Sequence, residues 1–311
     1  MADQLPVVLL MGPTASGKTE LAVALASHFD GEIISVDSSL VYRGMDIGTA
    51  KPSLEIRAQI PHHLIDILDP VQSFSAGQFR HQAIKLIEQI RQSGKLPILA
   101  GGTMLYFHGL LNGLAQLPVA DTQVRAEIDL EARRLGWRVM HQKLAEIDPQ
   151  SAARIHPNDT QRIQRALEVY RVSGKPLTDW IEDNRKTSFP YPKIPLVVAP
   201  KDRAMLHRRI ERRFYKMLEQ GFVEEVRELY RRKDMHQNLP AMRCVGYRQI
   251  WSYLAGEMDR ETMISKAIIA TRQLAKRQFT WLRRYQEAQW FDSEENQIIN
   301  TVISNISKSI R

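Results

Sequence analysis

Residues 7–28 read VVLLMGPTASGKTELAVALASH, and this stretch decides the fold of the chain's first third. Val7 to Met11 are all apolar, as in a strand buried on both faces, and Lys18 to His28 have the spacing of a helix. Between them stands the pattern G-x-x-x-x-G-K-T, which after a strand and before a helix is the phosphate-binding P-loop. The loop consists of Gly12, Pro13, Thr14, Ala15, Ser16, Gly17, Lys18 and Thr19.

A P-loop binds two adjacent phosphates. Its backbone N–H groups and the N-terminus of the next helix point at the phosphates, Lys18 adds a positive charge, and the Thr19 hydroxyl can hold Mg²⁺. This arrangement suits ATP, and it equally suits a diphosphate carried by an organic group. A kinase would transfer the terminal phosphoryl group, whereas an alkyl transferase would use the loop to stabilise a departing diphosphate. The motif alone leaves both reactions open.

Further apolar runs continue the alternation of strand and helix. Glu32 to Val36 and Leu96 to Ala100 are predicted buried strands, and Ala76 to Gln92 is a predicted helix. Strands that alternate with helices form parallel sheets with helices on both faces. We therefore expect an α/β fold whose core is a doubly wound parallel sheet of the P-loop NTPase type.

From Asp121 to Gly174 the sequence carries only helical signals. Asp121 and Asp159 suit N-caps, Gly136 and Gly174 suit helix ends, and Pro157 suits a break between helices. An all-helical insertion is therefore expected here.

The chain then returns to the sheet. Residues 189–195 are too rich in proline for a helix, and Leu196 to Ala199 is a predicted strand. Helices dominate afterwards to Tyr285, and Gln289 to Asp292 is a predicted edge strand before a C-terminal helix. We expect a catalytic core at residues 1–117 and 196–311 and a helical insertion domain at residues 118–195.

The composition excludes several classes of protein. The single cysteine, Cys244, cannot form an internal disulfide, and no cysteine and histidine set has the spacing of a structural zinc site. The apolar run near the start is far shorter than the ~20 residues of a membrane-spanning helix, and no basic segment of a secretion signal precedes it. We expect a cytoplasmic protein that does not enter a membrane.

The net charge of +8 is concentrated in one region. Residues 203–284 contain 19 Lys or Arg and 9 Asp or Glu, whereas the remainder of the chain contains 24 and 26. A regional excess of positive charge suggests a polyanionic partner, most often a nucleic acid. Solvated helix faces are the alternative explanation.

Two polar side chains follow predicted strands. Asp37 comes after the strand that ends at Val36, and Thr103 follows the turn Gly101-Gly102. Both should lie at the carboxyl edge of the parallel sheet, where ligands bind in such folds. The alternatives are a helix cap or an indirect Mg²⁺ carboxylate for Asp37, and a plain helix entry for Thr103.

Six segments, in one order along nearly the whole chain, together resemble the bacterial tRNA dimethylallyltransferases, which prenylate the adenine next to the anticodon. This resemblance is far more specific than a P-loop. The segments are GPTASGKT (12–19), ISVDSSLVYRGMDIGTAKP (34–52), AGGTMLYF (100–107), HPNDTQRIQRALEVY (156–170), RCVGYRQIWSYL (243–254) and TRQLAKRQFTWLR (271–283).

The resemblance implies that the P-loop holds the diphosphate of dimethylallyl diphosphate with Mg²⁺ at Thr19. The dimethylallyl group would pass to N6 of the adenine immediately 3′ of the anticodon, position 37 of the tRNA. Asp37 would contact the N6 amine and accept its proton, and Arg213 would hold the charge of the leaving diphosphate. Thr103 is the third residue assigned to catalysis, and we expect it to contact the substrate. ATP is expected to bind without being consumed.

The resemblance also implies a set of tRNA contacts. One departure from the family is Leu40, where many members carry glutamine, and it puts one polar contact in doubt. The residues assigned to tRNA are Asp37, Ser38, Ser39, Leu40, Thr103, Arg125, Gln161, Arg162, Ile163, Gln164, Arg165, Arg243, Cys244, Val245, Gly246, Tyr247, Arg248, Lys276, Arg277, Gln278, Phe279, Thr280, Trp281, Leu282 and Arg283.

The last of these segments forms a basic stripe if it is helical. Arg272, Lys276, Phe279 and Arg283 fall within about 60° of one another on a helix. Exposed cations on that stripe are suited to phosphates, while Phe279 suits either core packing or base stacking. Trp281 lies on the opposite face, where core packing is expected.

Several other residues are interpreted as structural. Cys244 is expected to pack as a small side chain and not to act as a nucleophile. His62 and His63 have no partner at metal-ligand spacing.

Two other functions remain as alternatives. A small-molecule kinase of the nucleoside or shikimate type would share the loop and the sheet, but would not need a regional positive charge. An RNA-binding NTPase switch would show nucleotide-dependent RNA affinity without a transfer product. In all three cases we expect a monomer, because no repeated apolar surface is visible in the sequence.

Overall fold

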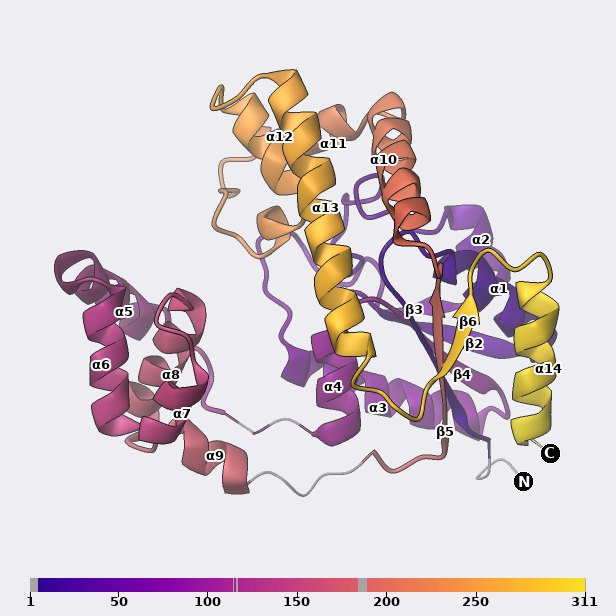
Figure 1. The fold of residues 1–311 in the computed structure, drawn as a ribbon, viewed down its shortest axis with the longest axis horizontal. Coiled ribbons are helices and arrows are strands. Elements are labelled where there is room, and N and C mark those ends of the chain that lie inside the picture. The colour runs from indigo at the N-terminus through magenta and orange to yellow at the C-terminus, as the bar shows by residue number, and fades with distance from the viewer. Residues whose placement is uncertain (1–4, 114, 116, 184–188, 311) are drawn as a thin grey trace. The chain divides into compact units, whose positions relative to one another are not determined.

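The computed structural model of the chain describes residues 5–113, 115, 117–183 and 189–310. It contains two compact units, one formed by Met1–Phe107 and Pro190–Arg311 and the other by His108–Phe189. We call them the sheet unit and the helical unit (Figure 1). Among the described residues, no helix combines the length and the apolar character needed to cross a bilayer.

The sheet unit contains one six-stranded sheet, in the order β3-β2-β4-β1-β5-β6, with every pair parallel. The predicted doubly wound α/β core is therefore confirmed. The short strand β3 was not predicted, because two residues carry no alternation. The strands are β1 (Val7–Met11), β2 (Gly31–Val36), β3 (His62–His63), β4 (Leu96–Gly101), β5 (Lys193–Ala199) and β6 (Gln289–Asp292).

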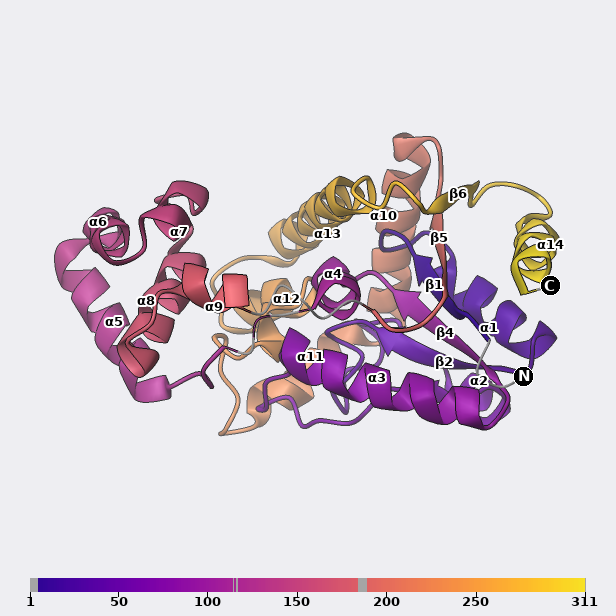
Figure 2. The same cartoon turned by 90° about the horizontal axis from the view of Figure 1, so that it is seen from below.

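Helices cover the sheet, as Figure 2 shows. On one face, α1 (Lys18–His28) and α14 (Ile298–Ile310) share an apolar core with the strands, through residues such as Leu25 and Ile306. The amphipathic helix α3 (Ala76–Gln92) packs against β2 and β4 and begins with a capping box at Ser75. The apolar strands are thus buried, as their sequences predicted.

The carboxyl ends of three strands meet at one edge of the sheet. Gly101 of β4 pairs with both Val36 of β2 and Met11 of β1. A Cβ atom at Gly101 would lie 2.1 Å from the Val36 carbonyl oxygen, so only glycine fits there. The P-loop, Asp37 and the Gly-Gly-Thr turn therefore begin side by side.

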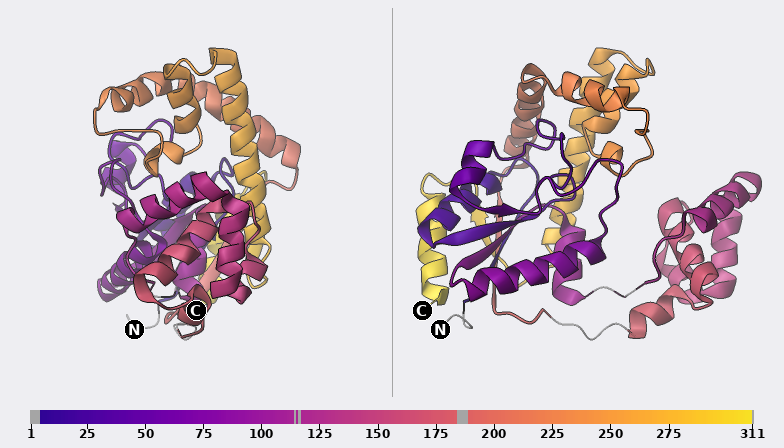
Figure 3. Two further views of the ribbon diagram at one scale, coloured as in Figure 1. Left: turned by 90° about the vertical axis from the view of Figure 1, so that its left-hand side faces the viewer. Right: turned by 180° about the vertical axis from the view of Figure 1, so that it is seen from behind.

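A second group of helices in the sheet unit forms its own core. The long helix α13 lies beside α10 and α12 (Figures 1 and 3). Buried aromatic side chains, among them Phe214, Phe222 and Tyr247, pack with Tyr42 and Met45. The elements of this group are α10 (Arg203–Glu219), α11 (Phe222–Arg231), the 3₁₀ turn Ala241–Arg243, α12 (Tyr247–Leu254) and α13 (Arg260–Leu282). The short helix α2 (Leu54–Gln59) also lies in the sheet unit but contributes no buried residue to this core.

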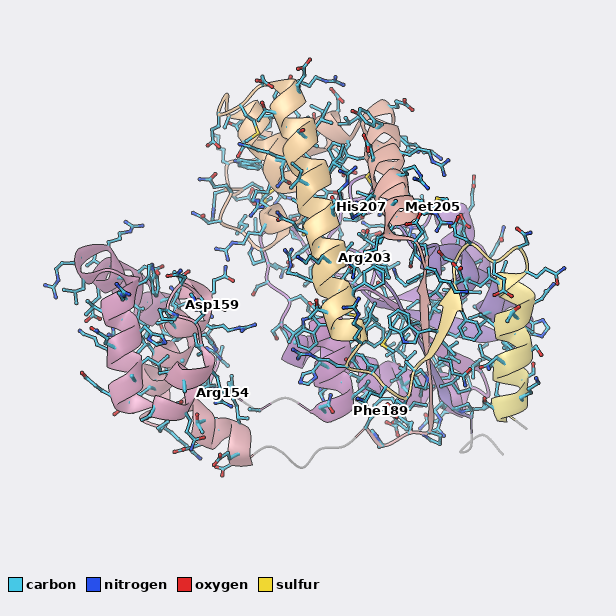
Figure 4. All side chains as sticks on the ribbon, viewed as in Figure 1. Arg154, Asp159, Phe189, Arg203, Met205 and His207 are labelled. Atoms are coloured by element: carbon cyan, nitrogen blue, oxygen red, sulfur yellow. The ribbon has the colours of Figure 1, made fainter. Side chains whose placement is uncertain are left out.

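The helical unit follows the predicted caps. Asp121 accepts hydrogen bonds from the backbone N–H groups of Gln123 and Val124, and Asp159, labelled in Figure 4, accepts one from Arg162 N–H. Gly136 and Gly174 end helices, as predicted. The helix that leads into this unit is α4 (Met104–Asn112), and those within it are α5 (Thr122–Leu135), α6 (Trp137–Ile147), α7 (Pro149–Arg154), α8 (Thr160–Ser173) and α9 (Leu177–Asp183).

Strand β5 begins earlier than predicted, at Lys193 instead of Leu196, although it contains Pro195. The N–H of Val7 donates to the Pro192 carbonyl. The backbone hydrogen-bonding groups of alternate residues of β5 therefore point toward β1, and those of Pro195 point to the opposite side, toward β6. On that side, β6 pairs with β5 only from Leu196 onward. The missing N–H of Pro195 therefore costs no hydrogen bond of the sheet.

Candidate active site

The P-loop joins β1 to α1 through two residues with positive φ. Gly17 has φ 86° and Ala15 has φ 62°, both in the left-handed region. A Cβ atom at Gly12 would lie 2.3 Å from the Val198 carbonyl oxygen. Lys18 Nζ folds back over the loop and donates to the Pro13 carbonyl oxygen at 2.5 Å. The loop is therefore a compact turn whose lysine stays close to its own backbone.

The P-loop opens onto a cavity of about 1360 Å³ that lies entirely within the sheet unit. Polar groups line it near the sheet edge, and α10 and α13 form another part of its wall. The lining includes residues 14–20, 37–40, 46–53, 100–105 and 243–247, together with Ile210, Arg213, Phe214, Met217, Phe222, Thr271, Leu274, Arg277, Gln278 and Trp281.

Asp37 follows β2 at the carboxyl edge of the sheet and lines the cavity. Its Oδ1 accepts hydrogen bonds from the Ser39 backbone N–H at 2.8 Å and from the Ser39 hydroxyl at 2.6 Å. Within the described part of the chain, Oδ2 accepts no hydrogen bond and remains available to a substrate. One carboxylate oxygen of Asp37 caps a local turn, and the other is available to a substrate. A capping role and a substrate contact are therefore compatible for this residue.

Thr103 holds the segment that carries Asp37. Its hydroxyl accepts the backbone N–H of Ser38 at 3.0 Å, and its own N–H donates to the Val36 carbonyl at 3.1 Å. It also immediately precedes α4, so it is a helix entry as well. The Thr103 hydroxyl is thus engaged with protein atoms that position Asp37.

Two cations in the cavity lie within electrostatic reach of Asp37. Burial is the main reason that the pKa of the Lys18 ammonium falls to about 7; Arg213 acts in the same direction and Asp37 opposes it. Burial also lowers the pKa of Arg213, again opposed by Asp37. Arg213 makes no ion pair or hydrogen bond with any other described residue. A half-buried cation without a close partner favours an anionic ligand.

Cys244 also lines the cavity. Burial raises the pKa of its thiol to about 12, and the Asp37 carboxylate acts in the same direction. A thiol that stays protonated at neutral pH agrees with the expectation that Cys244 does not act as a nucleophile.

Helix α13 presents two different faces. Thr271, Leu274, Arg277, Gln278 and Trp281 line the cavity. The predicted basic stripe lies on the other side, where Arg272 pairs with Glu211 of α10 at 2.8 Å and Phe279 packs with Leu206, Ile210 and Ala275.

The expectations for this helix change in two ways. Phe279 is half-buried and packs against Leu206, Ile210 and Ala275, which supports the core-packing interpretation. The expectation that Trp281 is a core residue is wrong: its half-buried ring lines the cavity and lies 4.7 Å below the Arg284 guanidinium. Lys276 and Arg283 are exposed.

Several residues assigned to tRNA point into the protein. Ile163, Tyr247 and Leu282 are fully buried core side chains, so their side chains do not lie on a surface that tRNA could contact. Arg125 and Arg165 lie 3.0 and 2.7 Å from the buried carboxylate of Glu168, which explains these arginines structurally. The exposed members are Ser38, Gln161, Arg162, Arg243, Arg248, Lys276, Arg277, Thr280 and Arg283.

The two histidines of β3 have structural partners. A ring nitrogen of His62 lies 2.7 Å from the Ile60 carbonyl oxygen, and His63 Nε2 lies 2.7 Å from a Glu32 carboxylate oxygen. These contacts agree with the structural role expected for both.

The oxygen donors of the cavity fit Mg²⁺. The Thr19 hydroxyl, which lines the cavity, is a hard ligand of the type that Mg²⁺ prefers. In the part of the chain that the structure describes, no group of three or more His, Cys, Asp or Glu side chains could hold a metal alone. A divalent ion here would take its remaining ligands from water and from substrate phosphates.

A family model described as IPP transferase matches residues 40–285. The chain belongs to the IPP transferase family. Since the matched stretch begins after the P-loop, membership does not depend on that widespread motif. This IPP transferase is 58% identical to a tRNA dimethylallyltransferase of Methylococcus capsulatus over 292 residues, which cover 94% of each chain.

Solved structures of similar proteins support the same family. The tRNA isopentenylpyrophosphate transferase of Bacillus halodurans has 36% identity and a TM-score of 0.72, covering 99% of this chain and 97% of that one. The Staphylococcus epidermidis tRNA delta(2)-isopentenylpyrophosphate transferase has 37% identity and a TM-score of 0.70, covering 98% of both chains. A eukaryotic dimethylallyltransferase acting on tRNA has 28% identity and a TM-score of 0.84, covering 99% of this IPP transferase and 80% of that chain.

Proposed function

We propose that this IPP transferase moves the dimethylallyl group from dimethylallyl diphosphate to N6 of the adenine immediately 3′ of the anticodon of tRNA, with release of diphosphate. The family and the relatives described above make the chain a tRNA dimethylallyltransferase. The observation that supports the chemistry is the cavity itself, where the half-buried cations Lys18 and Arg213 accompany the Asp37 carboxylate. We further propose a monomer that works in the cytoplasm.

In this proposal the N6 lone pair attacks C1 of the dimethylallyl group while the C1–O bond breaks and its electron pair leaves with the diphosphate. Lys18, Arg213 and the loop N–H groups stabilise the growing negative charge, each such donor contributing on the order of 10²-fold. Mg²⁺ at Thr19 supplies further positive charge when bound.

Asp37 is the proton acceptor in this proposal. The N6 lone pair is delocalised into the adenine ring and is therefore a poor nucleophile. A carboxylate that accepts the N6 proton as the N–C bond forms accelerates the step by roughly 10² to 10⁴-fold. Ser39 holds Oδ1, so Oδ2 is the oxygen assigned to the proton. To reach it, the adenine must leave its stack, as in other enzymes that modify bases.

One incubation tests this function. Unmodified tRNA and labelled dimethylallyl diphosphate are mixed with the enzyme, and the tRNA is digested to nucleosides. We expect labelled N6-dimethylallyladenosine in equal amount to the released diphosphate. Transfer of a phosphoryl group from ATP to a small molecule would instead support a kinase, which the family membership does not favour.

Inorganic diphosphate should compete with the prenyl donor, because the P-loop recognises the diphosphate and not the chain attached to it. The measurement is the inhibition pattern against each substrate, with ATP hydrolysis followed in parallel. ATP hydrolysis linked to product formation would contradict the proposal.

A further inference from the structure

Gln278 is a buried polar side chain of α13, with 7% of its surface exposed. Its Oε1 accepts the backbone N–H of Thr14 in the P-loop at 2.9 Å. Its Nε2 donates to the backbone carbonyl of Gly102 at 2.9 Å. One amide group thus joins the P-loop to the turn that follows β4.

The fit around this amide is close. A Cβ atom at Gly102 would lie 2.5 Å from Gln278 Nε2 and 3.3 Å from the Gly12 carbonyl oxygen. The glycine therefore lets the P-loop, the turn and α13 approach one another. The hydrogen bond to Gly102 is buried and the one to Thr14 is partly buried, and an unsatisfied backbone group in such a place is costly.

The second bond leads on to Asp37. Gly102 precedes Thr103, whose hydroxyl accepts the Ser38 N–H at 3.0 Å. The same turn therefore fixes the backbone next to the carboxylate. Gln278 lies where the diphosphate side and the adenine side of the proposed reaction meet.

We propose that Gln278 is a positioning residue that fixes the P-loop and the Gly102-Thr103 turn relative to each other, and that it does not read the tRNA. Because it accepts the Thr14 N–H, it sets the orientation of the Pro13–Thr14 peptide and leaves the later N–H groups of the loop for the diphosphate. This inference rests on the proposed function, since it takes the P-loop as the site of the donor's diphosphate.

Two variants test the inference. Gln278→Met keeps the length of the side chain without its polar atoms, and Gln278→Glu keeps an acceptor for the Thr14 N–H but loses the donor to Gly102 when ionised. For Gln278→Met we expect the affinity for inorganic diphosphate with Mg²⁺ to fall about tenfold or more, and kcat to fall as well. The Kd for tRNA should stay within about twofold.

The glutamate variant gives a signature that a core-filling role does not predict. When its carboxyl group is protonated, it can again accept from Thr14 and donate to Gly102. Its kcat/KM relative to wild type should therefore rise as the pH falls, since burial favours the protonated form. This variant also keeps the inference testable if Gln278→Met folds poorly.

The matched control is Gln249→Met, which removes another buried glutamine amide, one that accepts the Gly246 N–H at 2.9 Å. It should lose stability to a similar degree but keep its diphosphate affinity. Unchanged diphosphate affinity in folded Gln278 variants, or a raised tRNA Kd alone, would overturn the inference. If the wild-type enzyme itself fails to bind diphosphate, the proposed donor site is wrong, and that result is distinct from any effect of Gln278.

Discussion

Asp37 and Arg213 lie in the same cavity, but they act on different atoms in the proposed reaction. Asp37→Asn keeps an oxygen for the Ser39 N–H and removes the proton acceptor. We expect kcat to fall by at least ~10² with the donor KM within about twofold. Steady-state kinetics with each substrate varied measures both values. Near wild-type turnover in this variant would remove Asp37 from the chemistry.

Arg213→Ala should give the opposite kinetic signature. In the proposed reaction its guanidinium stabilises the leaving diphosphate, so the donor KM should rise about tenfold or more. Arg212→Ala is the matched control, because Arg212 is the adjacent but exposed arginine of α10. Equal effects of the two substitutions on the donor KM would argue against a specific role for Arg213.

Lys18 should titrate near neutral pH. Its pKa is about 7, against 10.5 for an ordinary lysine, mainly because it is buried. Between pH 7 and pH 10.5 the unfolded chain binds more protons at Lys18 than the folded chain does. In this range Lys18 therefore makes the stability of the fold rise with pH. A bound diphosphate should raise the pKa again, so binding takes up a proton above pH 7. Trace acetylation of Lys18, followed by mass spectrometry across pH, should show this shift, with exposed Lys276 as the control for general reactivity.

At the scale of one element, α13 has one face that lines the cavity and an opposite face that carries the basic stripe of Arg272, Lys276 and Arg283. Lys276 and Arg283 are exposed on the outer face, and we propose that they contact tRNA phosphates. Each contact contributes about −0.7 to −0.9 to the log-log dependence of affinity on salt. Removing both should weaken tRNA binding and flatten that slope by roughly 1 to 2 units. An unaltered slope across a salt titration would return both residues to a solvated helix face.

Glu225 of α11 holds residues 46–48, which line another part of the cavity. Its carboxylate accepts the backbone N–H groups of Asp46, Ile47 and Gly48 at 2.8, 2.6 and 3.1 Å, and the Tyr247 hydroxyl at 2.5 Å. Glu225→Gln leaves fewer acceptors for these donors, and we expect a loss of about 1–3 kcal/mol of stability.

Hydrogen exchange at residues 46–48 should become faster in the same variant. Glu224→Gln, an exposed neighbour on α11, serves as its control. Unchanged exchange at these amides would show that the Glu225 contacts do not hold the segment.

At the scale of the whole molecule, each unit has its own core. The helical unit packs Ile128, Leu144, Ile163 and others around a separate apolar centre. The cavity residues all belong to the sheet unit. We therefore expect that replacing residues 118–183 with a short Gly-Ser linker preserves diphosphate binding and lowers tRNA affinity. Calorimetry with diphosphate and filter binding with tRNA would test both halves, and loss of diphosphate binding in a folded variant would contradict the separation.

Features that depend on local patterns could be predicted from the sequence. An apolar run followed by the P-loop pattern predicts the unit of β1, loop and α1, and parallel strands bring Asp37 and Thr103 to one edge. The caps at Asp121 and Asp159 could also be predicted, because capping is a contact between residues two or three positions apart.

Which face of each helix lines the cavity depends on how the helices pack in the folded chain. Helical periodicity gives the angles between Trp281, Phe279 and Gln278, but it does not say which direction points inward. The contact between Gln278 and Thr14 spans 264 residues of chain. Likewise, the basic character of residues 203–284 was visible in the sequence, whereas the approach of Arg213 to Lys18 depends on how α10 packs. Local sequence fixes hydrogen bonds between near neighbours, and only packing over long separations brings such side chains together.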